Sequence, residues 1–117
     1  MAFDMYAYST NKENVQYGLI IIDEDKLETI FHWHSHIRLH SYFEDLYCEK
    51  GGEDTAFNGA YMEITSDDIN NLEKAIQQKT DYFYGRAYSH YQDDLDFIAK
   101  AREVLRKGDS LFYQSIW

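Results

Sequence analysis

The stretch IFHWHSHIRLHSYFEDLY, residues 30–47, contains four of the five histidines and one of the two tryptophans of the chain. When it is placed on a helix at 100° per residue, its large apolar side chains fall within one broad sector. That sector contains Trp33, His36, Ile37, His40, Phe43, Glu44 and Tyr47. We therefore predict one central helix over residues 30–47, with polar groups inside a core-facing stripe that the rest of the chain covers.

The length and composition of the chain indicate one compact domain. A chain of 117 residues has enough material to bury one hydrophobic core, but not two. Aromatic residues make up 17% of it, proline is absent and glycine occurs 6 times, which is unlike a disordered or linker-rich chain. We expect residues 1–117 to form a single domain.

Four short segments have the residue patterns of strands. Apolar and polar residues alternate at positions 1–8 and 60–65, which is the period of a strand with one buried face. Runs of β-branched and aromatic residues occupy positions 17–22 and 110–117. These segments predict a sheet of three or four short strands.

Two further helices are predicted after the central one. Residues 67–78 show helical apolar spacing behind Ser66, whose hydroxyl suits a cap, and residues 91–107 show it before Gly108. The aromatic segment 80–87 is interpreted as a buried loop or a short extended piece. The mixed order of elements predicts an α+β fold, with three helices packed on a small, mostly antiparallel sheet.

The charge of the chain restricts its partners. Eleven Lys and Arg face 21 Asp and Glu, for a net charge of -10. A surface of this sign is repelled by nucleic-acid phosphates and by anionic membranes. We therefore expect neither direct nucleic-acid binding nor membrane binding, and we expect a protein partner instead.

Acidic clusters at residues 23–25, 67–68 and 93–96 each lie at a predicted helix start, where the helix dipole favours carboxylates. This placement explains the clusters without a function. The excess of negative charge has two explanations, ordinary acidic solubility or a surface that imitates nucleic acid. In the second case the protein is an inhibitor of a nucleic-acid-binding protein.

Cys48 is the single cysteine, so the chain forms no internal disulfide and no cysteine-rich zinc site. We expect it to be a buried or half-buried helix residue. No basic region followed by an apolar run begins the sequence, and no apolar segment approaches the ~18 residues of a membrane span. The expected location is the cytoplasm.

Three histidines, His32, His36 and His40, are four residues apart and would lie along one side of the predicted helix. Two such imidazoles bind zinc when a third ligand is near, and Glu44 lies one turn further on. One hypothesis is therefore a small-ligand-binding protein or small enzyme built around His36, His40 and Glu44, with or without zinc as its cofactor. The HExxH pattern, which adds a catalytic base beside such ligands, is missing from the sequence.

The histidines also have structural interpretations. In the helix, His40 and Glu44 are expected to form a hydrogen-bonded pair within the aromatic core, because buried polar groups need partners. His32 and His34 are then partly exposed. A strand over residues 30–36 would instead align His32, His34 and His36 on one face, but the later apolar spacing favours a helix.

The 11 tyrosines are too many for the centre of one core. Tyrosine combines a rigid apolar ring with a polar tip and is enriched at binding surfaces. One short segment combines several of them with an arginine: Tyr82, Tyr84, Arg86, Tyr88 and Tyr91. We interpret it as a partner-binding face, and the alternative is that it closes the core under the last helix.

The order of these landmarks resembles an uncharacterised family of small proteins encoded by bacteriophages and prophages. The matching pieces are residues 3–6 (FDMY), Trp33, His40, Tyr42, Phe43, residues 51–54 (GGED), residues 82–85 (YFYG), residues 91–95 (YQDDL) and Trp117. The chain departs from that pattern at His34 and Ser35, where the family has Arg-Lys, and at Tyr82 and Tyr84, where it has phenylalanines. The resemblance implies a genomic setting, and with it the cytoplasm of a bacterial host cell as the location, but no mechanism.

These observations together predict a small acidic accessory protein of the phage type, non-enzymatic, that binds a host or phage macromolecule. No nucleophile elbow and no phosphate-binding glycine loop occurs in the sequence. The rival hypothesis is the enzyme or ligand-binding protein built on the histidines. A third is a homo-oligomer that associates through exposed tyrosines.

Overall fold

A four-stranded antiparallel sheet organises the fold in a computed structural model that describes residues 3–16, 21–22, 24–53, 57–84 and 90–116. The strand order is β4-β1-β6-β5. The strands are β1 (Asp4–Thr10), β4 (Glu28–His34), β5 (Met62–Ile64) and β6 (Ser110–Ile116). The central strands pair over their whole length, with Asp4 opposite Ile116 and Thr10 opposite Ser110.

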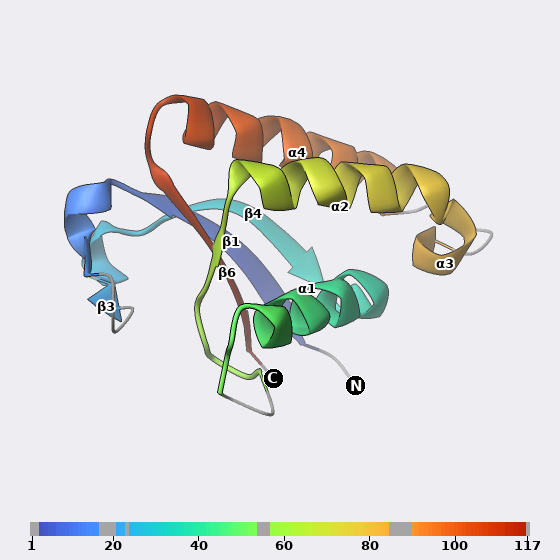
Figure 1. Cartoon of the computed structure of the whole chain (residues 1–117), viewed down its shortest axis with the longest axis horizontal. Helices are drawn as coiled ribbons and strands as arrows, with labels where there is room; N and C mark the ends of the chain where they lie inside the picture. Colours follow the sequence, from blue (N-terminus) through green and yellow to red (C-terminus); the bar gives the residue numbers. More distant parts are fainter. Residues whose placement is uncertain (1–2, 17–20, 23, 54–56, 85–89, 117) are drawn as a thin grey trace.

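Among the described residues there are three long helices, which cover the sheet, and one short helix, which packs against two of them. They are α1 (Ile37–Glu49), α2 (Ser66–Gln78), α3 (Thr80–Tyr84) and α4 (Tyr91–Arg106). Figure 1 shows α2 and α4 side by side, with α1 near the other end of the sheet. The predicted α+β architecture is confirmed. No described helix has both the length and the apolar composition needed to cross a bilayer.

Smaller elements lie between β1 and β4. Two 3-10 turns span Lys12–Asn14 and Glu24–Lys26, and β2 (Val15–Gln16) pairs with β3 (Ile21–Ile22) as a separate two-stranded ladder. Of the predicted strand at 17–22, residues 17–20 lie outside the described part. Asp23 also lies outside the described part, and Glu24 and Asp25 lie in a 3-10 turn rather than at the start of a long helix, so that part of the prediction is wrong.

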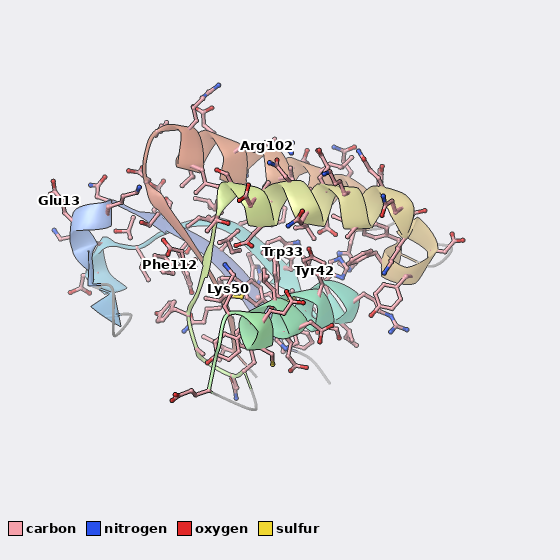
Figure 2. The ribbon with its side chains drawn as sticks, viewed as in Figure 1. Glu13, Trp33, Tyr42, Lys50, Arg102 and Phe112 are labelled. Atoms are coloured by element: carbon pink, nitrogen blue, oxygen red, sulfur yellow. The ribbon has the colours of Figure 1, made fainter. Side chains whose placement is uncertain are left out.

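Alternation along the strands gives the sheet two different faces. Inward-facing side chains of the sheet, including Met5, Trp33 and Tyr113, belong to the buried core together with Phe43 of α1 and Phe97 of α4. Figure 2 shows Trp33 in the interior, between α1 and the α2–α4 pair. The helices therefore complete one core over one face of the sheet.

The single helix predicted over residues 30–47 is wrong in its first part. Glu28–His34 is the edge strand β4, in which buried Trp33 lies opposite Met5 while both neighbouring histidines are exposed. A turn at Ser35, with φ 53°, then separates the strand from α1. Ile37, predicted to face the core, is 57% exposed. The strand interpretation was therefore correct as far as residue 34.

Two other boundaries differ from prediction. Helix α2 is capped by Thr65 rather than Ser66, because Thr65 Oγ1 accepts from the Asp68 amide at 3.2 Å and Asp68 Oδ2 accepts from the Thr65 amide at 2.8 Å. The segment predicted as a loop at 80–87 begins with helix α3. Gly108 has φ +86°, as its predicted place after the last helix requires.

Candidate functional site

Asp94 is the centre of a buried polar cluster. Its carboxyl group is 0% exposed in the first turn of α4, and its Oδ1 accepts a hydrogen bond from Trp33 Nε1 at 2.9 Å. Its Oδ2 accepts from the Tyr84 hydroxyl at 2.6 Å and lies 2.8 Å from His36 Nε2. We call these four residues the Asp94 cluster. It joins β4, the start of α1, α3 and α4.

Packing around the Asp94 cluster excludes solvent. The His36 ring stacks on the His90 ring, with centroids 4.4 Å apart and planes inclined by 15°. Burial raises the pKa of Tyr84 well above its usual range, and its hydrogen bond to the Asp94 carboxylate raises it further. His36 itself is 3% exposed. The His36 imidazole and the Asp94 carboxylate are enclosed in this way, so they connect secondary-structure elements and are not accessible to a substrate.

His40 occupies a second enclosed position. Its Nδ1 lies 2.8 Å from the Tyr113 hydroxyl, and its ring packs between Phe3 and Phe57, with centroid distances of 5.1 and 5.5 Å. Burial lowers the pKa of His40. Burial also raises the pKa of Tyr113, and the charge of Glu44 adds to this effect. The hydrogen bond of His40 to Tyr113 was not foreseen from the sequence, which suggested Glu44.

The predicted ligand set is not brought together. His36 points to Asp94 on α4, whereas His40 points to Tyr113 on β6, although both histidines lie at the start of α1. His32 is on another element, β4, so the row of three histidines on one helix is wrong. Across residues 3–16, 21–22, 24–53, 57–84 and 90–116, no three His, Cys, Asp or Glu side chains are arranged to hold a metal ion.

The tyrosine segment divides into a buried part and an exposed part. Tyr84 belongs to the Asp94 cluster, and Tyr91 packs edge-on against it at 5.3 Å. Tyr82 is 49% exposed. Arg86 and Tyr88 lie outside the described residues. Among the described tyrosines of this segment, Tyr82 therefore offers a partner the most exposed ring.

Tyr82 is part of an exposed corner between α1 and α3. The guanidinium carbon of Arg38 lies 4.9 Å from the centre of the Tyr82 ring, a cation–π arrangement. Beside it is a hollow of about 140 Å³. The hollow is lined by Tyr42, Asp45, Ala75, Lys79, Tyr82 and Phe83. We call this hollow, together with Ile37 and Arg38, the Tyr82 corner.

Sequence reasoning missed Ile37 as a surface residue. The helical wheel was drawn for a helix that began at residue 30, and it placed Ile37 in the core. Helix α1 instead begins at Ile37 and buries Leu39, His40 and Phe43, so Ile37 lies outside the buried face and remains 57% exposed. Cys48, expected to be at least half-buried, is exposed as well. The correct start of α1 was the signal that would have found this surface.

A second hollow, of about 390 Å³, lies between the beginning of β4 and the end of α4. Its charged lining is Glu28, Lys100, Glu103, Lys107 and Asp109. The Lys100 ammonium also lies 5.3 Å from the centre of the Phe31 ring. Because three carboxylates and two ammonium groups share this lining, its charge favours neither a simple anion nor a simple cation.

Comparison with known proteins identified no relative of this chain. No protein-family model, no curated protein and no solved structure matches the chain. The functional argument therefore depends on the geometry of the molecule, and above all on which of its chemically distinctive groups are enclosed and which are exposed.

Proposed function

We propose that the protein is a small acidic accessory protein that acts by binding another protein through the Tyr82 corner. The observation that carries this proposal is the Arg38 guanidinium stacked on the exposed Tyr82 ring at 4.9 Å, beside the hollow. Tyrosine and arginine dominate the energetic centres of protein interfaces. The stacking also holds both side chains in place before binding, which lowers the entropy lost on association.

Exposed apolar surface supports the same location. The large hydrophobic side chains most exposed among the described residues are Ile37 at 57%, Tyr82 at 49% and Ile116 at 48%. Two of these three belong to the Tyr82 corner. Fully burying one such aliphatic side chain is worth roughly 1.5–3 kcal/mol, so a partner that covers Ile37 gains measurable affinity.

The size and charge of the corner define the partner. A hollow of about 140 Å³ accepts one apolar side chain of the partner, with Asp45 at its rim and Asp81 on the same short helix as Tyr82. The net charge of -10 attracts a basic protein and speeds its association at low salt. Proteins that bind nucleic acid have basic surfaces, so a phage-type inhibitor of such a protein is the form of this function that we propose.

The test uses the full chain as bait in a bacterial lysate, followed by affinity measurement with the captured protein. Tyr82→Ala and Arg38→Ala are expected to weaken binding at least tenfold each, which corresponds to about 1.4 kcal/mol. Lys74→Ala is the matched control, because it removes one positive charge from an exposed position on α2. It therefore changes the net charge as Arg38→Ala does, and it should leave affinity unchanged.

Two outcomes contradict the proposal. One is a partner whose affinity is the same for wild type, Tyr82→Ala and Arg38→Ala, since the contact would then lie elsewhere. The other is repeated failure to capture any protein from the lysate at low salt. If Lys74→Ala weakens binding as much as Arg38→Ala does, the effect is one of net charge and the stacked pair has no special role.

A further inference from the structure

The outer face of the sheet, opposite the helices, has a covered half and an exposed half. Phe112 is 0% exposed, and Gln114 Nε2 donates to the Gly59 carbonyl at 3.0 Å. The Tyr61 ring lies 6.1 Å from the Tyr8 ring. The chain that leads into β5 therefore covers this half of the face.

The other half carries the exposed side chains. They are Asp4, His32, His34 and Ile116, which together with the half-buried Tyr6 form what we call the open patch. The side chains of Asp4, His32 and His34 are 45%, 48% and 66% exposed, and Ile116 is 48% exposed. Register places them together, because Asp4 lies opposite both His34 and Ile116, and Tyr6 lies opposite His32.

Contacts within the open patch hold its side chains in place. The Tyr6 ring stacks on the His32 ring at 4.9 Å, with planes inclined by 22°. Asp4 Oδ1 lies 2.9 Å from His32 Nε2 and 3.3 Å from His34 Nδ1. These hydrogen bonds lower the pKa of Asp4. A face whose rings and polar groups are already ordered loses little entropy when it is covered.

The charge of the open patch differs from that of the whole chain. The chain has 21 acidic side chains against 11 basic ones, whereas the patch contains one carboxylate that two imidazoles contact. A basic partner is therefore drawn to other surfaces. A second copy of this chain is repelled by most of the surface, and the open patch is a place where that repulsion is small.

We propose that two copies of the chain associate through their open patches, with sheet packed against sheet. In such a symmetric dimer each copy contributes the same patch, and the two sheets lie about 10 Å apart. Tyr6 and Ile116 of each copy are removed from water. The Tyr82 corner is left free, so this association is independent of the partner binding proposed above.

The test is the mass of the full chain in physiological salt, measured by sedimentation equilibrium over a wide concentration range. The expected mass rises toward twice 13.9 kDa as concentration increases. Ile116→Asp and His34→Glu each place an extra carboxylate on the open patch, and each should weaken the dimer at least tenfold. Ile37→Asp is the control, because it adds the same charge at a comparably exposed residue of the Tyr82 corner.

The control separates the two proposals. Ile37→Asp should weaken partner binding and leave the dimer intact, whereas Ile116→Asp should do the opposite. Circular dichroism establishes that each variant is folded before its mass is measured. A wild-type chain that stays at 13.9 kDa at the highest concentration overturns the dimer. So does a dimer that both patch variants leave unchanged, or one that Ile37→Asp weakens equally.

Discussion

His36 Nε2 lies 2.8 Å from Asp94 Oδ2, and both side chains are almost completely buried. The two residues are 58 positions apart, so this contact forms only when the start of α1 meets the start of α4. Trp33 and Tyr84 reach the same carboxyl group from β4 and α3. Asp94 thus connects four elements through hydrogen bonds inside a mostly apolar core.

Replacing Asp94 should therefore destabilise the fold strongly. Asp94→Ala removes the acceptor and leaves the Trp33 indole N–H and the Tyr84 hydroxyl buried without it, at about 1–3 kcal/mol for each. We expect the free energy of unfolding to fall by roughly 3 kcal/mol or more. Urea unfolding followed by circular dichroism measures the change.

The neighbouring Asp93 supplies the control for that experiment. Its side chain is 57% exposed, so Asp93→Ala should change the free energy of unfolding by about 0.5 kcal/mol at most. If Asp94→Ala proves as mild as Asp93→Ala, the three contacts to Asp94 contribute little to stability. The conclusion that the Asp94 cluster stabilises the fold would then be wrong.

Alkaline pH should destabilise the protein through its buried tyrosines, above all Tyr84 and Tyr113. Burial raises the pKa of both Tyr84 and Tyr113 above the ordinary value of 10.0. Above pH 10 the unfolded chain therefore releases protons that the folded chain retains, and stability falls as pH rises further. Absorbance at 295 nm during a pH titration should show these phenols ionising only as the protein unfolds.

Single substitutions can show which tyrosine causes the loss of stability at alkaline pH. Tyr113→Phe should flatten the decline of stability above pH 10, because one of the protons that the folded chain retains is gone. Tyr82→Phe is the comparison, since it removes a hydroxyl from a ring that is 49% exposed. Equal slopes for wild type and Tyr113→Phe would contradict the assignment.

The sequence predicted those elements whose apolar spacing had one interpretation. Helices α2 and α4 and strands β1, β5 and β6 all lie close to their predicted positions. The prediction of one helix over residues 30–47 was wrong for a simple reason. A strand that ends near Trp33 and a helix that starts at Ile37 together place apolar residues at intervals that also suit one longer helix. Residues 28–34 form a strand because they pair with β1, and the spacing of apolar residues along the sequence gives no information about that pairing.

The polar cluster was hidden for the same reason. Asp94 looked like one of several acids that favour a helix start, yet it lies four residues before Ile98 and seven before Ala101, on the buried stripe of α4. That position was the available signal of a buried carboxylate. Its partners Trp33 and Tyr84 are 61 and 10 residues away, so their identity depended on the tertiary fold.

Mild acid should weaken the fold through His40. Burial lowers the pKa of His40 below its ordinary value of 6.5, so the folded state keeps the imidazole neutral while the unfolded chain takes up a proton. Stability is therefore fully present above pH 6.5 and declines as pH falls below it. Asp4, whose pKa is lowered from 3.8, adds its own loss only at more acidic pH.

His40→Asn separates this effect from lost packing. An asparagine amide keeps a polar atom near the position of Nδ1, which contacts the Tyr113 hydroxyl, but it does not titrate. The variant should be less stable than wild type at pH 8, with a smaller decline between pH 6.5 and 5. Parallel curves for the two proteins over that interval would show that another group takes up the proton.

Gly52 should resist substitution because of Tyr47. A Cβ atom at Gly52 would lie 2.3 Å from the Tyr47 ring, which is too close for any real contact. That ring cannot move away freely, since it stacks on buried Phe57 with centroids 4.4 Å apart. Gly52→Ala should therefore lower the free energy of unfolding by roughly 1–3 kcal/mol, the usual range for overpacking.

The double variant Gly52→Ala with Tyr47→Ala identifies the cause of that loss. Tyr47→Ala alone destabilises the protein by removing the stacked ring, but it also opens the space that the new methyl group needs. Adding Gly52→Ala to it should then cost much less than adding Gly52→Ala to wild type, a difference that urea unfolding resolves. If the two costs are equal, the strain at Gly52 arises from the backbone after α1 and not from the Tyr47 ring.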